Sequence, residues 1–210
     1  MKSSARPHDW PVNHDPILDA LADTGWISFP GFMAPTEARA LAAECSARWD
    51  GGEFHRAGVG RGAGLAVREE VRQDDVLWLD RGGAGPAQDR WLDTTDELRA
   101  SMNRGLFLGL QDYQGHFAIY PVGGFYKPHL DRHENTRSRI ITAILYLNDG
   151  WIHGDGGELK LWTTPGDKDG AFELIEPRLG TLVLFRAADF WHEVLPANRT
   201  RMSITGWQRV

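Results

Sequence analysis

The stretch TRMSITGWQRV (residues 200–210) alternates between polar and less polar side chains. One face would carry Arg201, Ser203, Thr205 and Trp207, and the other Met202, Ile204 and Gly206. Successive side chains point to opposite sides of a β-strand, so this pattern predicts a strand with one polar face. A polar face with an arginine implies a polar cavity and not a sealed core, because a buried guanidinium is costly without an anion beside it.

The same two-residue period extends upstream as far as residue 115. Six further short runs are separated by Gly, Pro, Asp and Asn turns: GHFAIYP, SRIITAILYLN, GELKLW, AFELI, TLVLF and HEVL. Many short strands joined by frequent turns are typical of a β-sandwich or barrel. We therefore predict a β core over residues 115–210.

In the N-terminal part of the chain, apolar residues recur every three or four residues, as in a helix, and not every two residues, as in a strand. Apolar residues predict one helix over residues 15–24 and a second after Pro35, with Cys45 as a small core residue on its buried face. The capping box Thr94–Glu97 predicts the start of a third helix. GWISFPGF between the first two helices predicts a short strand.

The remaining N-terminal segments lack a clear period. Residues 51–64 and 81–89 are glycine-dense and predict loops, and residues 66–80 fit either an edge ribbon or a solvated surface. Residues 1–14 form a polar leader. We expect one domain over residues 15–210, with its helices packed outside the β core.

Composition excludes several classes of protein. The chain has 210 residues, a net charge of −6 and 25% charged residues, which is an ordinary globular balance and argues against a protein that coats nucleic acid. Cys45 is its single cysteine, so we expect a reducing, cytoplasmic location. We see no signal peptide and no apolar run long enough for a membrane span.

Two segments together suggest a metal site. His129 and Asp131 in YKPHLDRH are two residues apart, so on a strand both would point to the same face. His192 in WHEVLPA follows sixty-one residues after Asp131 and could supply a third ligand. Two histidines and one carboxylate form the facial triad of non-haem Fe(II) oxygenases. Each residue alone is more often structural, and it is the combination that favours a metal.

Arg201 lies nine residues after His192 and suggests a co-substrate. A dicarboxylate could chelate the metal with one end and meet Arg201 with the other. Tyr120 and Tyr126, just before the metal motif, could donate phenolic hydrogen bonds.

Six segments resemble the prolyl-hydroxylase branch of the Fe(II)/2-oxoglutarate dioxygenases: YPVGGFYKPHLD, ITAILYLNDGW, GGELKLW, IEPRLGTLVLF, HEVLPA and RMSITGW. Within that branch, the sequence is similar to the animal hypoxia-inducible-factor (Egl-nine type) prolyl hydroxylases and their bacterial counterparts. The resemblance covers residues 17–209. It includes EEVRQDDVLW, which is similar to a mobile finger loop of the family. The glycines, charges and paired Asp74-Asp75 of residues 58–80 predict a mobile flap, and the resemblance implies that it closes over a protein substrate. The implied fold is a double-stranded β-helix, or jelly-roll, with bracing helices.

The resemblance also implies roles for individual residues. His129, Asp131 and His192 would bind Fe(II), and Arg201 would bind 2-oxoglutarate. Tyr120, Tyr126, Thr205 and Trp207 would line the co-substrate pocket, with Arg72, Arg139 and Trp191 at the substrate rim. Leu145 stands where animal relatives have a tyrosine that binds the co-substrate carboxylate, so we expect that donor to be missing or replaced. Trp191 stands where a proline is usual before the distal histidine.

Three functions follow as hypotheses. The first is a peptidyl-proline 4-hydroxylase that uses Fe(II), 2-oxoglutarate and O₂, with ascorbate as a possible reductant, and acts on an exposed proline loop of a cytosolic protein such as a translation elongation factor. The second is an oxygenase for a free amino acid or another small metabolite, with nucleic acid ranked low as a target. The third is a non-catalytic metal-binding jelly-roll that serves as an oxygen sensor or binding module. We leave the oligomeric state open, with a monomer as the working expectation.

Overall fold

The computed structural model describes residues 13–58, 66–83, 85–132 and 138–210. Three helices are α1 (Asp15–Asp23), α2 (Pro35–Asp50) and α3 (Pro86–Leu106). The strands are β1 (Trp26–Phe29), β2 (His55–Arg56), β3 (Asp75–Trp78), β4 (Asp112–Tyr120), β5 (Tyr126–His129), β6 (Arg139–Tyr146), β7 (Leu159–Trp162), β8 (Phe172–Ile175), β9 (Leu182–Arg186), β10 (His192–Val194) and β11 (Arg201–Arg209). All seven runs predicted as strands from residue 115 onward are strands.

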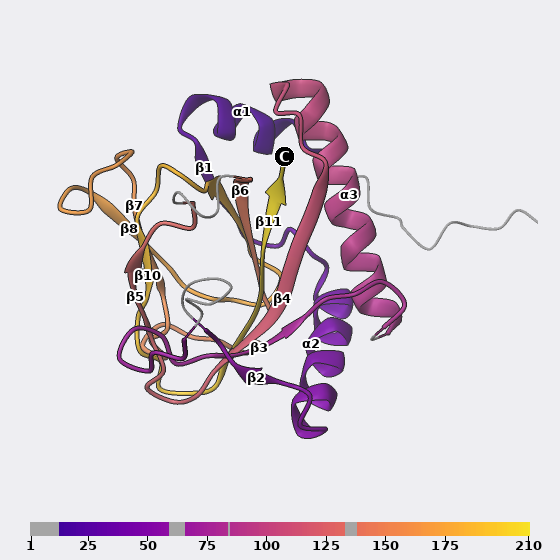
Figure 1. Cartoon of the computed structure of the whole chain (residues 1–210), viewed down its shortest axis with the longest axis vertical. Coiled ribbons are helices and arrows are strands. Elements are labelled where there is room, and N and C mark those ends of the chain that lie inside the picture. The colour runs from indigo at the N-terminus through magenta and orange to yellow at the C-terminus, as the bar shows by residue number, and fades with distance from the viewer. Residues whose placement is uncertain (1–12, 59–65, 84, 133–137) are drawn as a thin grey trace, which may run out of the picture.

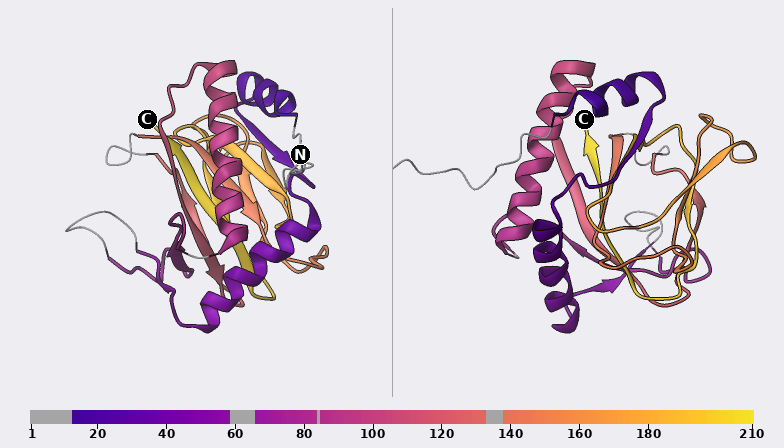
Figure 2. Two further views of the ribbon diagram at one scale, coloured as in Figure 1. Left: turned by 90° about the vertical axis from the view of Figure 1, so that its right-hand side faces the viewer. Right: turned by 180° about the vertical axis from the view of Figure 1, so that it is seen from behind.

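The strands form two antiparallel sheets that face each other (Figure 1). The larger has seven strands in the order β1-β9-β6-β11-β4-β3-β2, and the smaller has four in the order β5-β10-β7-β8. In Figure 2, α2 and α3 cross the outer face of the seven-stranded sheet. The predicted mainly β jelly-roll with bracing helices is confirmed. No helix in the described part of the chain is long and apolar enough to cross a membrane.

Strand alternation divides the core into two layers. On β4, Phe117 and Ile119 face the helices, whereas Ala118 and Tyr120 face the smaller sheet. Each strand of the larger sheet therefore contributes to a sealed apolar layer on one side and to the space between the sheets on the other. Cys45 lies in the helix-facing layer, and burial raises the pKa of its thiol to about 12, as expected of a structural residue.

α3 begins nine residues earlier than its capping box predicted. The helix starts at Pro86, and the Thr94 hydroxyl donates to the carbonyl of Arg90 within the helix instead of capping its start. The cap comes from α2, since both carboxylate oxygens of Glu44 accept hydrogen bonds, from the backbone N–H groups of Ala87 and Gln88, each at 2.8 Å. A Cβ at Gly85 would lie 2.5 Å from Glu44 Oε1, so a larger residue there would displace the capping carboxylate.

Part of the expected flap is sheet. Within residues 58–80, β3 pairs with β4 on one side and β2 on the other, as the edge-ribbon alternative predicted. Asp74 is fully buried and forms an ion pair with Arg72, so the prediction that Asp74-Asp75 belongs to a mobile flap was wrong. Residues 59–65 of that segment, like most of the polar leader, lie outside the described residues.

Candidate active site

A cavity of about 490 Å³ lies between the two sheets. Its floor is the inner face of β4 and β11, and its opposite wall comes from β5, β10 and β7. Ten of the eleven predicted site residues line it: Arg72, Tyr120, Tyr126, His129, Asp131, Arg139, His192, Arg201, Thr205 and Trp207. The exception is Trp191, which precedes the inward-facing His192. The centre of its ring lies 5.5 Å from Lys168 Nζ.

The predicted metal ligands meet at one side of this cavity. His129 ends β5, His192 begins β10, and the two residues are paired across the smaller sheet. Asp131 lies two residues beyond the end of β5, yet its carboxylate oxygens approach Nε2 of His129 at 3.7 Å and of His192 at 3.5 Å. One ligand atom from each residue lies within 4.8 Å of the other two.

Backbone carbonyls orient both imidazoles. His129 Nδ1 donates to Lys127 O at 2.8 Å and His192 Nδ1 to Phe190 O at 3.1 Å, which leaves each Nε2 with a free lone pair. Tyr126 stacks on His129 with ring centres 3.6 Å apart and fixes its plane. Burial and the neighbouring His192 lower the pKa of His129 to about 3, so its ring is neutral at physiological pH.

Asp131 is held as a carboxylate. Burial opposes its ionisation, but His192, His129 and Arg139 outweigh that effect and lower its pKa to about 2. The Thr142 hydroxyl donates to Oδ2 at 2.8 Å and fixes the carboxylate plane. Two imidazoles and one carboxylate on the same side of a cavity match the donor set and open face that Fe(II) needs.

Arg201 supplies the strongest sign of a bound anion. It is 1% exposed, and its Nε donates a hydrogen bond to Gly157 O at 2.8 Å. No described carboxylate lies within ion-pair distance of its guanidinium, although a buried charge of this kind is costly without a partner. The guanidinium can therefore bind a carboxylate that enters the cavity.

Tyr146 belongs beside Arg201, and sequence reasoning missed it. The Arg201 guanidinium lies 5.1 Å from the ring centres of both Tyr120 and Tyr146. The Tyr146 hydroxyl is buried, and burial raises its pKa to about 12 against the opposing effect of the neighbouring Arg201. A protonated phenol at this place can donate to the carboxylate that Arg201 binds.

The expectation that Leu145 removes the tyrosine donor was therefore wrong. Leu145 faces the helices and is part of their apolar layer, whereas Tyr146 faces the cavity. Neighbouring residues of a strand point to opposite faces. Placing the family's tyrosine one residue too early therefore assigned the co-substrate contact to the core residue Leu145 in place of the cavity residue Tyr146. Alternation counted from Thr142, an inward residue, would have identified Tyr146.

Arginines line the cavity near β3. The Arg72 guanidinium lies 4.4 Å from the ring centre of Tyr126 and pairs with the buried Asp74. The Arg139 guanidinium lies 3.3 Å from the ring centre of Trp207, and its Nη1 donates to the backbone oxygen of Asp131 at 3.3 Å. Both arginines are therefore fixed by protein groups and shape the wall next to the metal ligands.

Comparison with known proteins agrees with this geometry. The sequence model of the 2OG-Fe(II) oxygenase superfamily matches residues 115–209. The structure is similar to a prolyl-4-hydroxylase of Pseudomonas putida, with 44% identity over 93% of this chain and 98% of that one, and a TM-score of 0.85. The chain belongs to the 2OG-Fe(II) oxygenase superfamily. Within that superfamily it is a dioxygenase of the prolyl 4-hydroxylase type.

Other proteins are similar to this oxygenase over part of their sequence or in their fold. Egl nine homolog 1 of Homo sapiens is 31% identical over 154 residues, which are 66% of this chain and 33% of that protein. The chain therefore matches about a third of the length of these curated relatives. A Trichoplax adhaerens prolyl hydroxylase, solved with a hypoxia inducible factor peptide, shares the fold with a TM-score of 0.79 at 24% identity, covering 92% of this chain and 87% of that one.

Membership of this superfamily assigns the cofactors. The oxygenase uses Fe(II), with 2-oxoglutarate and O₂ as co-substrates. The residues fit these groups on two independent observations, namely the three-residue donor set and the buried Arg201 that lacks an acidic partner.

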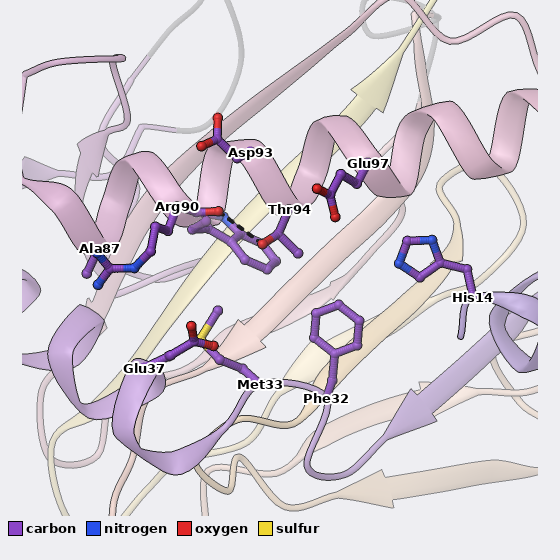
Figure 3. A pocket seen from close by; sticks show the side chains of 10 residues that line it. His14, Phe32, Met33, Glu37, Ala87, Arg90, Asp93, Thr94 and Glu97 are labelled. Carbon is purple, nitrogen blue, oxygen red and sulfur yellow. Dashed lines mark hydrogen bonds between the residues drawn. The ribbon is translucent and has the colours of Figure 1, made fainter. Parts of the chain in front are cut away.

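A second cavity in the oxygenase lies away from this site. It has a volume of about 40 Å³ and lies between α3 and the segment that follows β1. In Figure 3, Thr94 and Glu97 from α3 face Phe32 and His14 across it. A space of this size holds little more than one water molecule, so we assign it no ligand.

Proposed function

We propose that this protein hydroxylates C4 of a prolyl residue in an exposed loop of another protein, with release of succinate and CO₂. The observation that carries this proposal is the match to the Pseudomonas putida prolyl-4-hydroxylase over nearly the whole of both chains. We propose a cytosolic target, and a translation elongation factor is the first candidate to test. Ascorbate is the proposed auxiliary reductant and a monomer the proposed state.

In this proposal the chain positions three reactants in one cavity. His129, Asp131 and His192 hold Fe(II), which together with 2-oxoglutarate and O₂ supplies the oxidising chemistry. Arg201 and Tyr146 hold the far carboxylate of 2-oxoglutarate. Burial of this end of the cavity excludes water from the co-substrate and strengthens its electrostatic contacts.

A prolyl segment suits the other end of the cavity. Its lining there includes His55 and Arg56 on β2, Trp78 on β3 and Arg139 on β6. Proline fixes its own φ angle, so an extended segment that contains it loses less conformational entropy on binding than a flexible one. Free L-proline would make none of the flanking contacts and is therefore expected to be a poor substrate.

A lysate experiment tests the proposal. The purified protein, supplied with Fe(II), 2-oxoglutarate and ascorbate, is incubated with a bacterial lysate, and peptides are searched by mass spectrometry for prolines that gain one oxygen atom. The control is His192→Ala, which should leave those prolines unmodified. Efficient turnover of free proline, with no prolyl peptide modified, would contradict the proposal and favour a small-molecule oxygenase.

A further inference from the structure

His116 lies in the cavity floor at a position that the metal and co-substrate sites do not use. It belongs to β4, and its direct cross-strand neighbours are Trp78 on β3 and Thr205 on β11. All three residues line the cavity. His116 therefore lies between β3 and the strand that carries Arg201.

Two tryptophans enclose its ring. The ring centre of Trp78 lies 4.9 Å from that of His116 in an edge-to-face arrangement, and the ring centre of Trp207 lies 5.6 Å away. Trp207 is the cross-strand neighbour of Thr142, whose hydroxyl binds Asp131. This aromatic floor, Trp78–His116–Trp207, thus leads from the β3 side of the cavity to the metal ligands.

The polar atoms of this floor are unsatisfied. His116 is 4% exposed and its Nδ1 is buried without a partner, as is Nε1 of the 5% exposed Trp207. Within the described residues, neither side chain forms a hydrogen bond. Both atoms are enclosed by protein, so a ligand in the cavity could meet the imidazole only through its other nitrogen, Nε2, which is not among the enclosed atoms.

The state of the imidazole identifies the kind of partner. Burial and the nearby Arg72 lower the pKa of His116 to about 3, so the ring is neutral and carries one N–H donor. An unpartnered buried acceptor is tolerated better than an unpartnered buried donor. The proton therefore belongs on Nε2, and the enclosed Nδ1 keeps the lone pair. A neutral donor among aromatic rings suits a carbonyl oxygen better than an anion.

We infer that His116 Nε2–H donates a hydrogen bond to a backbone carbonyl next to the target proline of the substrate peptide. This inference rests on the proposed function and deepens it, because it makes His116 a specificity-determining residue of the same site. Proline lacks an N–H group, so the backbone around it presents more acceptors than donors. A cavity floor with an uncompensated donor is complementary to such a segment.

Substitution of the ring tests this inference. His116→Phe keeps an aromatic ring but removes both nitrogens, and it should raise the KM for a synthetic peptide spanning the modified proline about 5- to 15-fold, the effect of one lost hydrogen bond. His116→Gln retains an amide donor and should recover part of the affinity. His153→Phe, at an exposed histidine outside the cavity lining, is the matched control and should match the wild type. The KM for 2-oxoglutarate is measured alongside, since an equal rise in both constants would mean a deformed cavity and would overturn the inference.

A modified peptide gives an independent test. Replacing the carbonyls on either side of the proline by thioamides, one at a time, weakens each acceptor without changing the sequence. One of the two replacements should weaken binding to the wild type and have no effect on His116→Phe. If both proteins respond equally to both replacements, His116 does not bind those carbonyls. If the wild type hydroxylates no prolyl peptide, the proposed function fails; if it does and His116→Phe has an unchanged peptide KM, only this inference fails.

Discussion

Arg201→Met should remove most of the stabilisation of the protein by 2-oxoglutarate. In the structure, Arg201 is 1% exposed, and its Nε donates a hydrogen bond to Gly157 O. Among the described residues no carboxylate pairs with its guanidinium, so the co-substrate carboxylate would supply the missing anion. Methionine has a similar length but cannot bind an anion. Without co-substrate, the variant should be at least as stable as the wild type, because it removes a buried charge that lacks an acidic partner.

The size of the effect follows from linkage. A ligand at a hundred times its Kd stabilises the folded state by about 2.7 kcal/mol. For a protein of this size, that corresponds to a rise in Tm of roughly 5–11 °C. Loss of the charged hydrogen bonds costs about 3 kcal/mol, or roughly a 150-fold increase in Kd. At the same concentration of 2-oxoglutarate, the rise in Tm should then shrink to about 1 °C.

Thermal unfolding with Mn(II) in place of iron, in the absence of O₂, measures this difference without turnover. Arg199→Met is the matched control, because Arg199 is largely exposed, pairs with Asp155 and does not line the cavity. Its response to 2-oxoglutarate should equal that of the wild type. Arg201→Lys keeps the charge but loses the planar fork, so its shift should be intermediate. A wild-type shift in Arg201→Met would show that the co-substrate binds elsewhere and would refute the reasoning.

Three further substitutions test other parts of the structure. Tyr146→Phe should raise the KM for 2-oxoglutarate roughly 10- to 150-fold, because it removes a hydrogen bond to a carboxylate. Leu145→Ala should lower the free energy of unfolding by about 2–5 kcal/mol and leave that KM unchanged. The reverse pattern would assign the co-substrate contact to Leu145 instead. His192→Ala should lose bound iron, as measured by metal analysis of the purified protein, and full metal occupancy with retained activity would disprove the triad. Glu44→Ala should lower the free energy of unfolding by about 1–2 kcal/mol in urea, because the start of α3 loses its cap, and an unchanged midpoint would show that the cap contributes nothing.

The metal site could be predicted from sequence because its residues carry a local signal. His129 and Asp131 are two residues apart, and the period-two pattern downstream placed His192 and Arg201 near the ends of strands. The chemistry of two imidazoles, a carboxylate and a distant guanidinium then restricted the possible functions. Their positions in the structure, around one cavity between two sheets, agree with that reasoning.

The features that sequence reasoning missed depend on contacts between distant segments. The start of α3 depends on Glu44 of another helix, so the local capping box gave the wrong boundary. The role of Tyr146 depends on which face of a strand it occupies, and a shift of one residue reversed that face. His116 stands out only when β3, β4 and β11 are placed side by side, because its neighbours Trp78 and Thr205 are far away in the sequence.

The two sheets divide the site between them, and this has a mechanical consequence. Two of the three metal ligands belong to the smaller sheet, whereas Arg201 belongs to the larger one, which the helices brace. A co-substrate that reaches from the metal to Arg201 therefore links the four-stranded sheet to the seven-stranded sheet, which the helices stabilise. Heating that loosens the four-stranded sheet would misalign the reactants before the seven-stranded sheet unfolds. Activity should thus decline at a lower temperature than secondary structure, and the difference between the two temperatures should be smaller when 2-oxoglutarate is bound.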